Sequence, residues 1–355
     1  MGDVGHRVDM RQSNMELLRI IAMLGVILLH YNVAGMGNAF ELTSVRANSL
    51  LLQCLEAVYA WPVDAFMMLS GYFMCTKKSV DIKKPVALLI ELVFFQLVFE
   101  FAGAMMRQET LSAKLLLMKL VPANYFVILY IAVYIFSPFI NRFLSGLSAA
   151  QCKKLLVLLV AVFSVWPYAV ELLERSTLYP LGQASTISSM GTQNGYNITN
   201  FALCYVVGAT LRKNVVELKK PLLLYAAATL GVVCTAVVFG IYTAVEYCSP
   251  FVILQAAALI RLFERVNIPH SKVINKLAEA SFTVYLTHTV LYSYCVVEKY
   301  ANSSILALLA HVLVCRIAIY LVCFAVFIVY DALTKPLFNW LWSRVKAPRI
   351  DLEVA

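Results

Sequence analysis

The chain has 355 residues, of which 61% are hydrophobic and only 14% are charged, and its mean hydropathy is +0.79. This composition excludes an ordinary soluble protein and indicates several membrane-spanning helices, because apolar runs of about 18 residues or more recur along the chain. The net charge of +9 does not indicate nucleic-acid binding, since the basic residues fall in short clusters between the apolar runs.

Ten helices are predicted, and together they indicate a single all-α polytopic membrane domain over residues 15–335. They cover residues 15–34, 50–75, 85–105, 124–141, 155–173, 198–211, 221–243, 250–266, 281–298 and 305–330. Lysines and arginines cluster in the connections on one side of the membrane, the side on which both termini lie. Because basic connections are typical of the cytoplasmic side, both termini are predicted to be cytoplasmic. The segments 1–14 and 336–355 are therefore expected to be cytoplasmic ends. The first apolar run lacks a small-residue cleavage site, so we expect it to remain as a span.

The first predicted helix carries a line of polar side chains. Arg19 and His30 are eleven residues apart, which is about three helical turns, so both project from nearly the same face with a rise of about 16 Å. Glu16 lies one turn before Arg19 on that face. Ionisable groups inside a membrane are costly and mark a functional site by default. The alternative is an Arg19 that snorkels to the headgroups beside Glu16 and an interfacial His30 with a structural hydrogen bond.

The second predicted helix carries Asp64 near its middle, two residues after Pro62, which frees a backbone carbonyl. We expect Asp64 to face the bundle interior. Ser70 and Gly71, followed by Tyr72, are also typical of close helix packing in membranes, which is the alternative to a role in a site.

Two later helices supply further candidates. Tyr125 begins the fourth helix and is either a site residue or an aromatic anchor at the outer membrane surface. Ser281, Tyr285 and His288 recur at spacings of four and three residues, so they share one helix face. His288 is expected either to support His30 or bind substrate, or to make a structural hydrogen bond.

Three other features are less specific. The segment 174–200, rich in Ser, Thr, Gly, Gln and Asn, is the longest outer loop and is either flexible or a lid over a polar substrate. Residues 111–121 form an amphipathic stretch that suits the outer membrane surface. His311 and Arg316 are polar residues of the last helix, but their spacing of five places them about 140° apart, so we do not expect them to act together. The nine cysteines form no CxxC pair and are interpreted as packing thiols.

Taken together, these segments resemble the membrane-bound acyltransferase 3 family, and the resemblance covers almost the whole chain. The resemblance rests on four elements that occur in the family's order. Arg19 and His30 match its Arg-x10-His element, and Asp64 to Tyr72 match its Asp-x-Phe-Phe-x-x-Ser-Gly-Tyr-like segment, with Met67 in place of the second Phe. Pro138 to Asn141 match its Pro-Phe-Ile-Asn element, and Tyr285 to His288 match its Tyr-Leu-x-His element. The chain departs from the family at Asn124-Tyr125-Phe126, where Tyr-Trp-Phe is frequent.

The resemblance implies an acyltransferase of the bacterial cytoplasmic membrane. It would move an acyl group, usually acetyl from acetyl-CoA, to a hydroxyl of a surface polysaccharide or of a lipid-linked sugar precursor. The implied catalytic residues are His30 and Arg19. The implied supporting or substrate-binding residues are Glu16, Asp64, Ser70, Tyr72, Tyr125, Tyr285 and His288. No metal and no tightly bound cofactor are expected, and the partners are acyl-CoA, the glycan acceptor and membrane lipids.

The residues leave several alternatives open. His30 is suited to act as general base on a sugar hydroxyl, or to accept the acyl group itself and pass it on. Arg19 is suited to pair with a phosphate or pantetheine oxygen of CoA, or to order the helix through Glu16. Succinyl or another short acyl group is an alternative to acetyl. A transporter or flippase of a glycan or lipid-linked sugar is the main alternative function, and a receptor or scaffold is a third.

Overall fold

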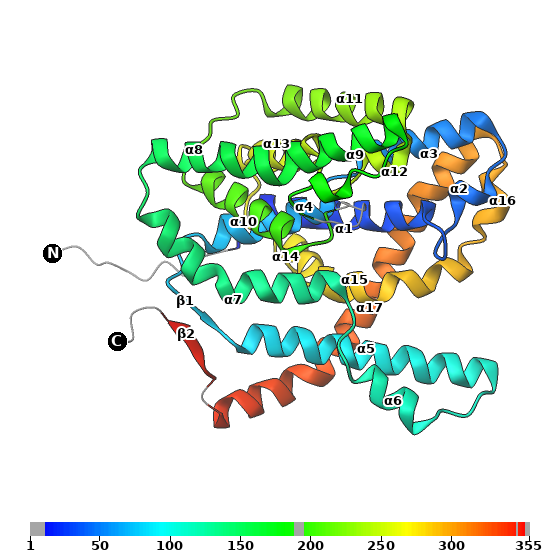
Figure 1. Cartoon of the computed structure of the whole chain (residues 1–355). Coiled ribbons are helices and arrows are strands. Elements are labelled where there is room, and N and C mark those ends of the chain that lie inside the picture. Colours follow the sequence, from blue (N-terminus) through cyan, green and yellow to red (C-terminus); the bar gives the residue numbers. More distant parts are fainter. Residues whose placement is uncertain (1–10, 188–194, 346, 352–355) are drawn as a thin grey trace.

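The computed structural model describes residues 11–187, 195–345 and 347–351, so parts of the expected N-terminal end, of the 174–200 loop and of the C-terminal tail lie outside the described residues. In chain order the helices are α1 (Ser13–Asn32), α2 (Ala39–Leu42), α3 (Arg46–Val58), α4 (Pro62–Met74), α5 (Lys83–Arg107), α6 (Ala113–Lys119), α7 (Tyr125–Ser145), α8 (Ala149–Val160), α9 (Trp166–Thr177), α10 (Ile198–Arg212), α11 (Pro221–Phe239), α12 (Ile241–Ala244), α13 (Pro250–Glu264), α14 (Lys272–Glu279), α15 (Ser281–Thr287), α16 (Val297–Ala301) and α17 (Ile305–Arg344). The π-helical turn η1 (Ala161–Val165), the 3-10 helices η2 (Gly182–Ala184) and η3 (His288–Tyr294), and the strands β1 (Ser79–Asp81) and β2 (Arg349–Asp351) complete the fold (Figure 1).

The expected all-α polytopic membrane fold is confirmed. Among the described residues, seven helical segments are long and apolar enough to cross a membrane. They are α1, α3 with α4, α5, α7, α8 to α9, α11 and α17. The three other predicted spans are shorter helices: α10 and α13 have 15 residues each, and the last is divided between α15 and η3.

The short helices lie inside the bundle, which explains why they need not match the thickness of a bilayer. Most side chains of α10 and α13 are buried by neighbouring helices and not available to lipid. The most hydrophobic stretch of α1 is 61% buried, whereas that of α5 is only 11% buried. The helices α1, α4, α10 and α13 therefore form an interior, and α5, α8, α11 and α17 lie around it (Figure 1). Many apolar side chains of these outer helices are exposed.

The second predicted span is divided into two helices. α3 ends at Val58 and α4 begins at Pro62, because proline has no backbone N–H and is best tolerated in the first turn of a helix. The indole of Trp61 donates a hydrogen bond to the Val58 carbonyl (3.0 Å), which satisfies one of the groups left free by the break. The break places the start of α4, with Val63 and Asp64, in the middle of the bundle.

α4 and α10 cross in direct backbone contact. A Cβ atom on Gly71 would lie 1.9 Å from the Tyr205 carbonyl oxygen, and one on Gly208 would lie 1.9 Å from the Met68 carbonyl oxygen. Only glycine at both positions permits this approach. The contact fixes the position of α4, which lines the cavities described below.

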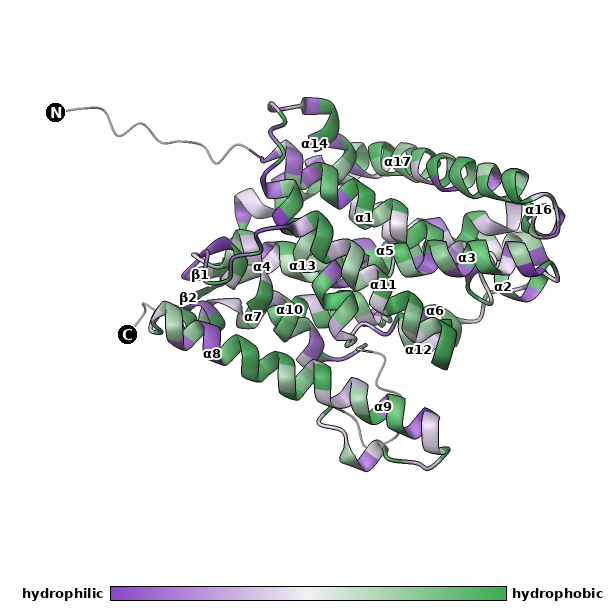
Figure 2. Cartoon of the chain, turned by 90° about the horizontal axis from the view of Figure 1, so that it is seen from above, coloured by the Kyte–Doolittle hydropathy of each residue, from purple (hydrophilic) through white to green (hydrophobic). Residues whose placement is uncertain are grey.

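The last helix is longer than predicted, because α17 continues to Arg344. Beyond it, β2 pairs antiparallel with β1, with Val80 opposite Ile350. This pairing holds the C-terminal segment against the connection between α4 and α5, at the end of the bundle where hydrophilic residues gather around β1 and α14 (Figure 2). Lys77 and Lys83 flank β1, and Lys272 and Lys276 belong to α14, so we call this end the basic end.

Candidate active site

Two histidines from distant parts of the chain form a pair at the centre of the site. His30 lies in the last turn of α1, and His288 begins η3 directly after α15. Nδ1 of His30 lies 2.6 Å from Nε2 of His288. His288 is completely buried. The two side chains therefore act as one hydrogen-bonded unit.

The surroundings of His288 determine which nitrogen carries each proton. Nδ1 of His288 lies 2.9 Å from the Val284 carbonyl oxygen, an acceptor, so this nitrogen carries the proton in neutral His288. Nε2 of His288 then accepts a hydrogen bond from Nδ1–H of His30. This assignment leaves Nε2 of His30 as a proton acceptor, which is the form that a general base requires.

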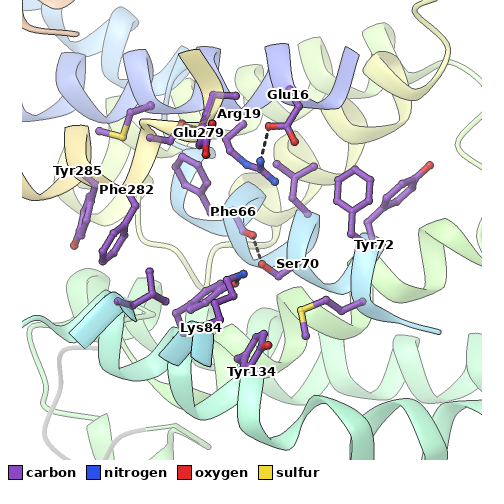
Figure 3. A pocket seen from close by; sticks show the side chains of 18 of the residues that line it. Glu16, Arg19, Phe66, Ser70, Tyr72, Lys84, Tyr134, Glu279, Phe282 and Tyr285 are labelled. Carbon is purple, nitrogen blue, oxygen red and sulfur yellow. Dashed lines mark hydrogen bonds and ion pairs between the residues drawn. The ribbon is translucent and has the colours of Figure 1, made fainter. Parts of the chain in front are cut away.

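A cavity of about 680 Å³ extends from the basic end into the bundle. Glu16 and Arg19 of α1 lie on one wall, and Lys84 of α5 with Tyr134 of α7 lie on the opposite wall (Figure 3). We call this space the inner cavity. In the described part of the chain, its charged lining side chains are five basic ones and two acidic ones: Arg11, Arg19, Lys77, Lys84, Arg212, Glu16 and Glu279. The excess of positive charge suits a polyanionic ligand.

Arg19 is held by its own helix. Its Nη1 makes an ion pair with Glu16 three residues earlier, and Glu16 is 5% exposed. Because the pair is within one turn of α1, it orients the guanidinium along the cavity wall. The structure thus brings Arg19 and Glu16 together, as the spacing predicted.

Tyr72 belongs to a network at the mouth of the inner cavity that the sequence did not reveal. Its hydroxyl donates to Glu264 (2.8 Å) and accepts from Arg212 (3.0 Å), whose guanidinium also lies 5.0 Å from the Tyr72 ring centre. Arg261 pairs with Glu264 and donates to the Leu211 carbonyl. Glu264 and Arg261 therefore hold Tyr72 and Arg212 in place.

Lys84 and Tyr130 are further lining residues that the sequence did not single out as a site. The Lys84 ammonium donates to the Tyr130 hydroxyl and lies over the Tyr130 and Tyr134 rings, 5.0 and 5.2 Å from their centres. Ser70 also lines this cavity, and its hydroxyl donates to the Phe66 carbonyl (3.0 Å; Figure 3). Tyr130 and Tyr134 of α7 therefore pack against each other and also form part of the cavity wall.

A second cavity, of about 300 Å³, lies beyond the inner one, and we call it the outer cavity. His30 and His288 line it, together with Tyr125 from the start of α7 and Asn124, the residue before it. The Tyr125 ring contacts the Tyr196 ring edge-on, with centres 4.7 Å apart. Unlike the inner cavity, the outer cavity has no Asp, Glu, Lys or Arg among its described lining residues.

The two cavities adjoin at three residues that line both: Val26 of α1, Val63 of α4 and Tyr285 of α15. The Tyr285 hydroxyl donates to Asn124 Oδ1 (3.1 Å), and Asn124 also caps the start of α7 by accepting from the Val127 N–H. The polar line of α1 is therefore divided: Arg19 faces the inner cavity and His30 faces the outer one.

Asp64 lies apart from both cavities. It is 1% exposed, and its Oδ1 accepts a hydrogen bond from Asn200 of α10 (3.1 Å). Its other carboxyl oxygen has no hydrogen-bond partner among the described residues. Asp64 faces the bundle interior as expected, but the contact that it makes ties α4 to α10 and does not reach His30.

His311 and Arg316 of α17 do not contact each other in the described hydrogen bonds. His311 Nδ1 lies 2.8 Å from the Tyr31 hydroxyl, and its ring stacks on Tyr300. The Arg316 guanidinium lies 5.4 Å from the centre of the Tyr59 ring. In the described part of the chain, no group of three His, Cys, Asp or Glu side chains is arranged to hold a metal ion.

A family model described as an acyltransferase domain matches residues 12–330, which include the four elements on which the resemblance depended. No match was found among curated proteins or among solved structures.

Proposed function

The chain belongs to the acyltransferase 3 family of multi-pass membrane acyltransferases, and we propose that it transfers an acetyl group from cytoplasmic acetyl-CoA to a hydroxyl of a surface glycan or its lipid-linked precursor. We further propose that it resides in a bacterial cytoplasmic membrane with both termini in the cytoplasm. Family membership favours an enzyme over the transporter and scaffold alternatives.

The main support for the proposal is that the pair formed by His30 and His288 lies beyond the inner cavity, whose lining is mainly basic. The inner cavity has the positive charge that would attract the phosphates of CoA, with Arg212 and Lys77 among its lining residues. Its far end adjoins the outer cavity, where His30 and His288 lie. A thioester extended through the inner cavity would thus approach His30 from one side, and an acceptor hydroxyl in the outer cavity would approach it from the other.

In the proposed step, His30 acts as general base. The acceptor hydroxyl gives its proton to Nε2 of His30 while its oxygen attacks the thioester carbonyl carbon. The new C–O bond forms and the C–S bond breaks, and the CoA thiolate takes the proton from His30. The products are the ester and the CoA thiol, and His30 returns to its neutral form.

His288 supports this step as a positioning residue. Its Nε2 accepts a hydrogen bond from Nδ1–H of His30, which holds the imidazole ring and fixes its tautomer. The alternative, in which His30 itself carries the acyl group on Nε2, uses the same tautomer. Arg19 and Glu16 would act on the donor side, because they line the inner cavity and not the outer one.

The test is acyl transfer in membranes that contain the protein, measured with radiolabelled acetyl-CoA and extraction of surface glycan and lipid-linked sugars. Wild type is expected to label one of these fractions. The variant His30→Ala is expected to reach the membrane at a normal level and to transfer at a rate reduced by about 10²- to 10⁴-fold, which is the usual contribution of a general base. Label on the protein itself, lost in His30→Ala, would favour the acyl-carrier role.

His270→Ala is the matched control, because His270 is an exposed histidine outside both cavities. It should transfer label like wild type. Full activity of His30→Ala would contradict the site assignment. No transfer by wild type from acetyl-CoA or succinyl-CoA would contradict the proposed donor class.

A further inference from the structure

The outer cavity is lined by a buried hydrogen-bond acceptor that lacks a partner. This acceptor is Oε1 of Gln96, a residue of α5 that lines the cavity, and no described residue donates to it. The Nε2 group of Gln96 donates to the Val121 carbonyl at 3.4 Å, and the reversed amide would set two acceptor oxygens against each other. Because a buried amide oxygen without a partner is costly, we expect a ligand group to donate to it.

Asn124 supplies hydrogen-bond donors to the same cavity. Its Oδ1 accepts from the Val127 N–H (3.2 Å) and from the Tyr285 hydroxyl (3.1 Å), and a backbone N–H only donates, so the orientation of this amide is also fixed. Nδ2 of Asn124 takes part in none of the described hydrogen bonds, and its two N–H groups are available to a ligand. An acceptor on Gln96 and donors on Asn124 suit hydroxyl groups, since each hydroxyl both donates and accepts.

Much of the remaining lining is aromatic. Tyr125, which is 40% exposed, and Tyr247 line the outer cavity together with Phe95 and Phe99. Aromatic walls with a few fixed polar groups are typical of sites that bind small molecules. Such a lining suits a sugar ring, which presents apolar C–H groups as well as hydroxyls.

The outer cavity offers no cation to an acidic sugar. No Lys or Arg is among its described lining residues, and His30 and His288 are neutral in the tautomers assigned above. Basic side chains at the end of α5 and on α6 are already paired, Arg107 with Glu109 (2.8 Å) and Lys119 with Glu100 (3.1 Å). A carboxylate in this cavity would lose its hydration without gaining a charged partner, and an ionised carboxylate has no proton to donate to Gln96.

We propose that the sugar residue that receives the acyl group is uncharged, and that Gln96 and Asn124 bind its hydroxyls beside His30. The class comprises hexoses, deoxyhexoses and N-acetylhexosamines, and it excludes uronic acids, sialic acids and phosphorylated sugars. This inference rests on the proposed function, because it assumes that the acceptor enters the outer cavity.

The first test identifies the sugar residue that carries the transferred group. Membranes that contain the wild-type protein are supplied with acetyl-CoA labelled with a stable isotope, and their glycan and lipid-linked sugars are analysed by tandem mass spectrometry. We expect labelled acetyl on an uncharged residue. Labelled acetyl on a uronic acid, a sialic acid or a phosphorylated sugar would overturn the inference and leave the proposed function intact.

The second test replaces Gln96 and measures KM for the acceptor. The acceptor is the fraction that wild type labels, isolated from cells that lack the protein. Gln96→Met keeps the size of the side chain but removes the amide oxygen, so KM for the acceptor should rise by about tenfold while KM for acetyl-CoA stays unchanged. Gln96→Lys should also raise KM, because an ammonium has donors but no acceptor for a sugar hydroxyl. A lower KM in Gln96→Lys would indicate an acidic acceptor and would overturn the inference.

Gln53→Met is the matched control. Gln53 lies on α3, lines neither cavity and donates to Ser49 Oγ of its own helix (3.2 Å). Both KM values of this variant should equal those of wild type. An unchanged KM for the acceptor in Gln96→Met would overturn the assignment of Gln96, whereas absence of transfer by wild type would overturn the proposed function and this inference with it.

Discussion

At the scale of single residues, His30 depends on a partner that is itself an imidazole. Many catalytic histidines are oriented by a carboxylate, but here the acceptor for Nδ1–H is Nε2 of His288. The second nitrogen of His288 is committed to the Val284 carbonyl, so His288 can accept from His30 but has no second proton to offer. The pair therefore fixes one tautomer of His30 without placing a negative charge in the membrane.

Replacement of His288 tests this positioning role. In His288→Ala, His30 loses the acceptor for Nδ1–H, and we expect kcat to fall by about 10²-fold while KM for acetyl-CoA stays unchanged. In His288→Gln, the amide oxygen is able to accept the same hydrogen bond, so kcat should stay within about tenfold of wild type. Steady-state kinetics with labelled acetyl-CoA measure both parameters.

A purely structural role of His288 would give a different pattern. Loss of packing would lower the amount of folded protein, or change KM and kcat together, and glutamine would not rescue it. Equal kcat values for the alanine and glutamine variants would contradict the proposed hydrogen-bond role.

Arg19 gives a second prediction at this scale, on the donor side. The guanidinium pairs with Glu16 through Nη1 and has further donors for a ligand in the inner cavity, whereas lysine offers only a point charge. Arg19→Lys is therefore expected to raise KM for acetyl-CoA by about tenfold, with a smaller change in KM for the acceptor. Arg142→Lys is the control, since Arg142 is exposed on α7 and lines neither cavity. An unchanged KM for acetyl-CoA in Arg19→Lys would remove Arg19 from the donor site.

At the scale of helices, the local pattern of the sequence was a good guide to what lies on one element. The helical period placed Glu16 beside Arg19, and it aligned Tyr285 with His288. Pro62 was predicted only to free a backbone carbonyl within one helix over residues 50–75, whereas α3 and α4 are separate helices. The bounds of the two enclosed helices were predicted within two residues, as 198–211 for α10 and 250–266 for α13, and both are short because they are enclosed by protein and need not span lipid.

Contacts between helices could not be predicted in the same way. His30 and His288 are 258 residues apart in the chain, and their contact was only one of the alternatives predicted for His288; the contact between Lys84 and Tyr130, 46 residues apart, was not predicted. Such pairs depend on how helices cross, which no local period encodes. The expectation for Asp64 shows the same limit: a carboxyl group inside a membrane indicated a site, but Asp64 contacts Asn200 and lines neither cavity.

The crossing of α4 and α10 gives a prediction for the stability of the bundle. In Gly71→Ala or Gly208→Ala, the new methyl group would meet a carbonyl oxygen of the facing helix at 1.9 Å, so the helices must move apart. Overpacking of this kind costs about 1–3 kcal/mol or more. We expect the midpoint of thermal unfolding in detergent to fall by at least about 5 °C.

Gly146→Ala is the matched control for this prediction. Gly146 follows α7 with a φ of −80°, and the nearest atom to an added Cβ is 3.6 Å away, an ordinary contact distance. Its unfolding midpoint should stay within about 2 °C of wild type. A similar midpoint for Gly71→Ala would show that α4 and α10 are not in close contact in the membrane.

At the scale of the whole molecule, the two cavities differ in the charge of the side chains that line them. Among the described residues, every charged side chain that lines a cavity belongs to the inner one, which opens near Arg11 and Lys77 at the basic end. The described lining of the outer cavity consists of aromatic, aliphatic and amide side chains, the two histidines, Met36 and Thr289. If basic ends face the cytoplasm, donor and acceptor reach His30 from opposite sides of the membrane.

This arrangement predicts that transfer has a fixed sidedness. Acetyl-CoA is membrane-impermeant, so labelled acetyl-CoA added outside should be used by inside-out membrane vesicles, in which the basic end faces the medium. It should not be used by right-side-out vesicles, and a pore-forming detergent at low concentration should make the two preparations equal. The measurement is the initial rate of label transfer to glycan or lipid-linked sugar in each preparation, normalised to the amount of protein.

The sidedness experiment also tests the inner cavity itself, independently of the outer one. Arg212 lies at its mouth, held against the Tyr72 ring, whereas Lys114 lies on α6 and lines neither cavity. In inside-out vesicles Arg212→Gln should therefore raise KM for acetyl-CoA by several-fold, and Lys114→Gln should leave it unchanged, because only the former removes a positive charge from the donor's path. Faster transfer by right-side-out than by inside-out vesicles would mean that the donor enters through the outer cavity. The assignment of the two cavities would then have to be reversed, even if His30 remained essential.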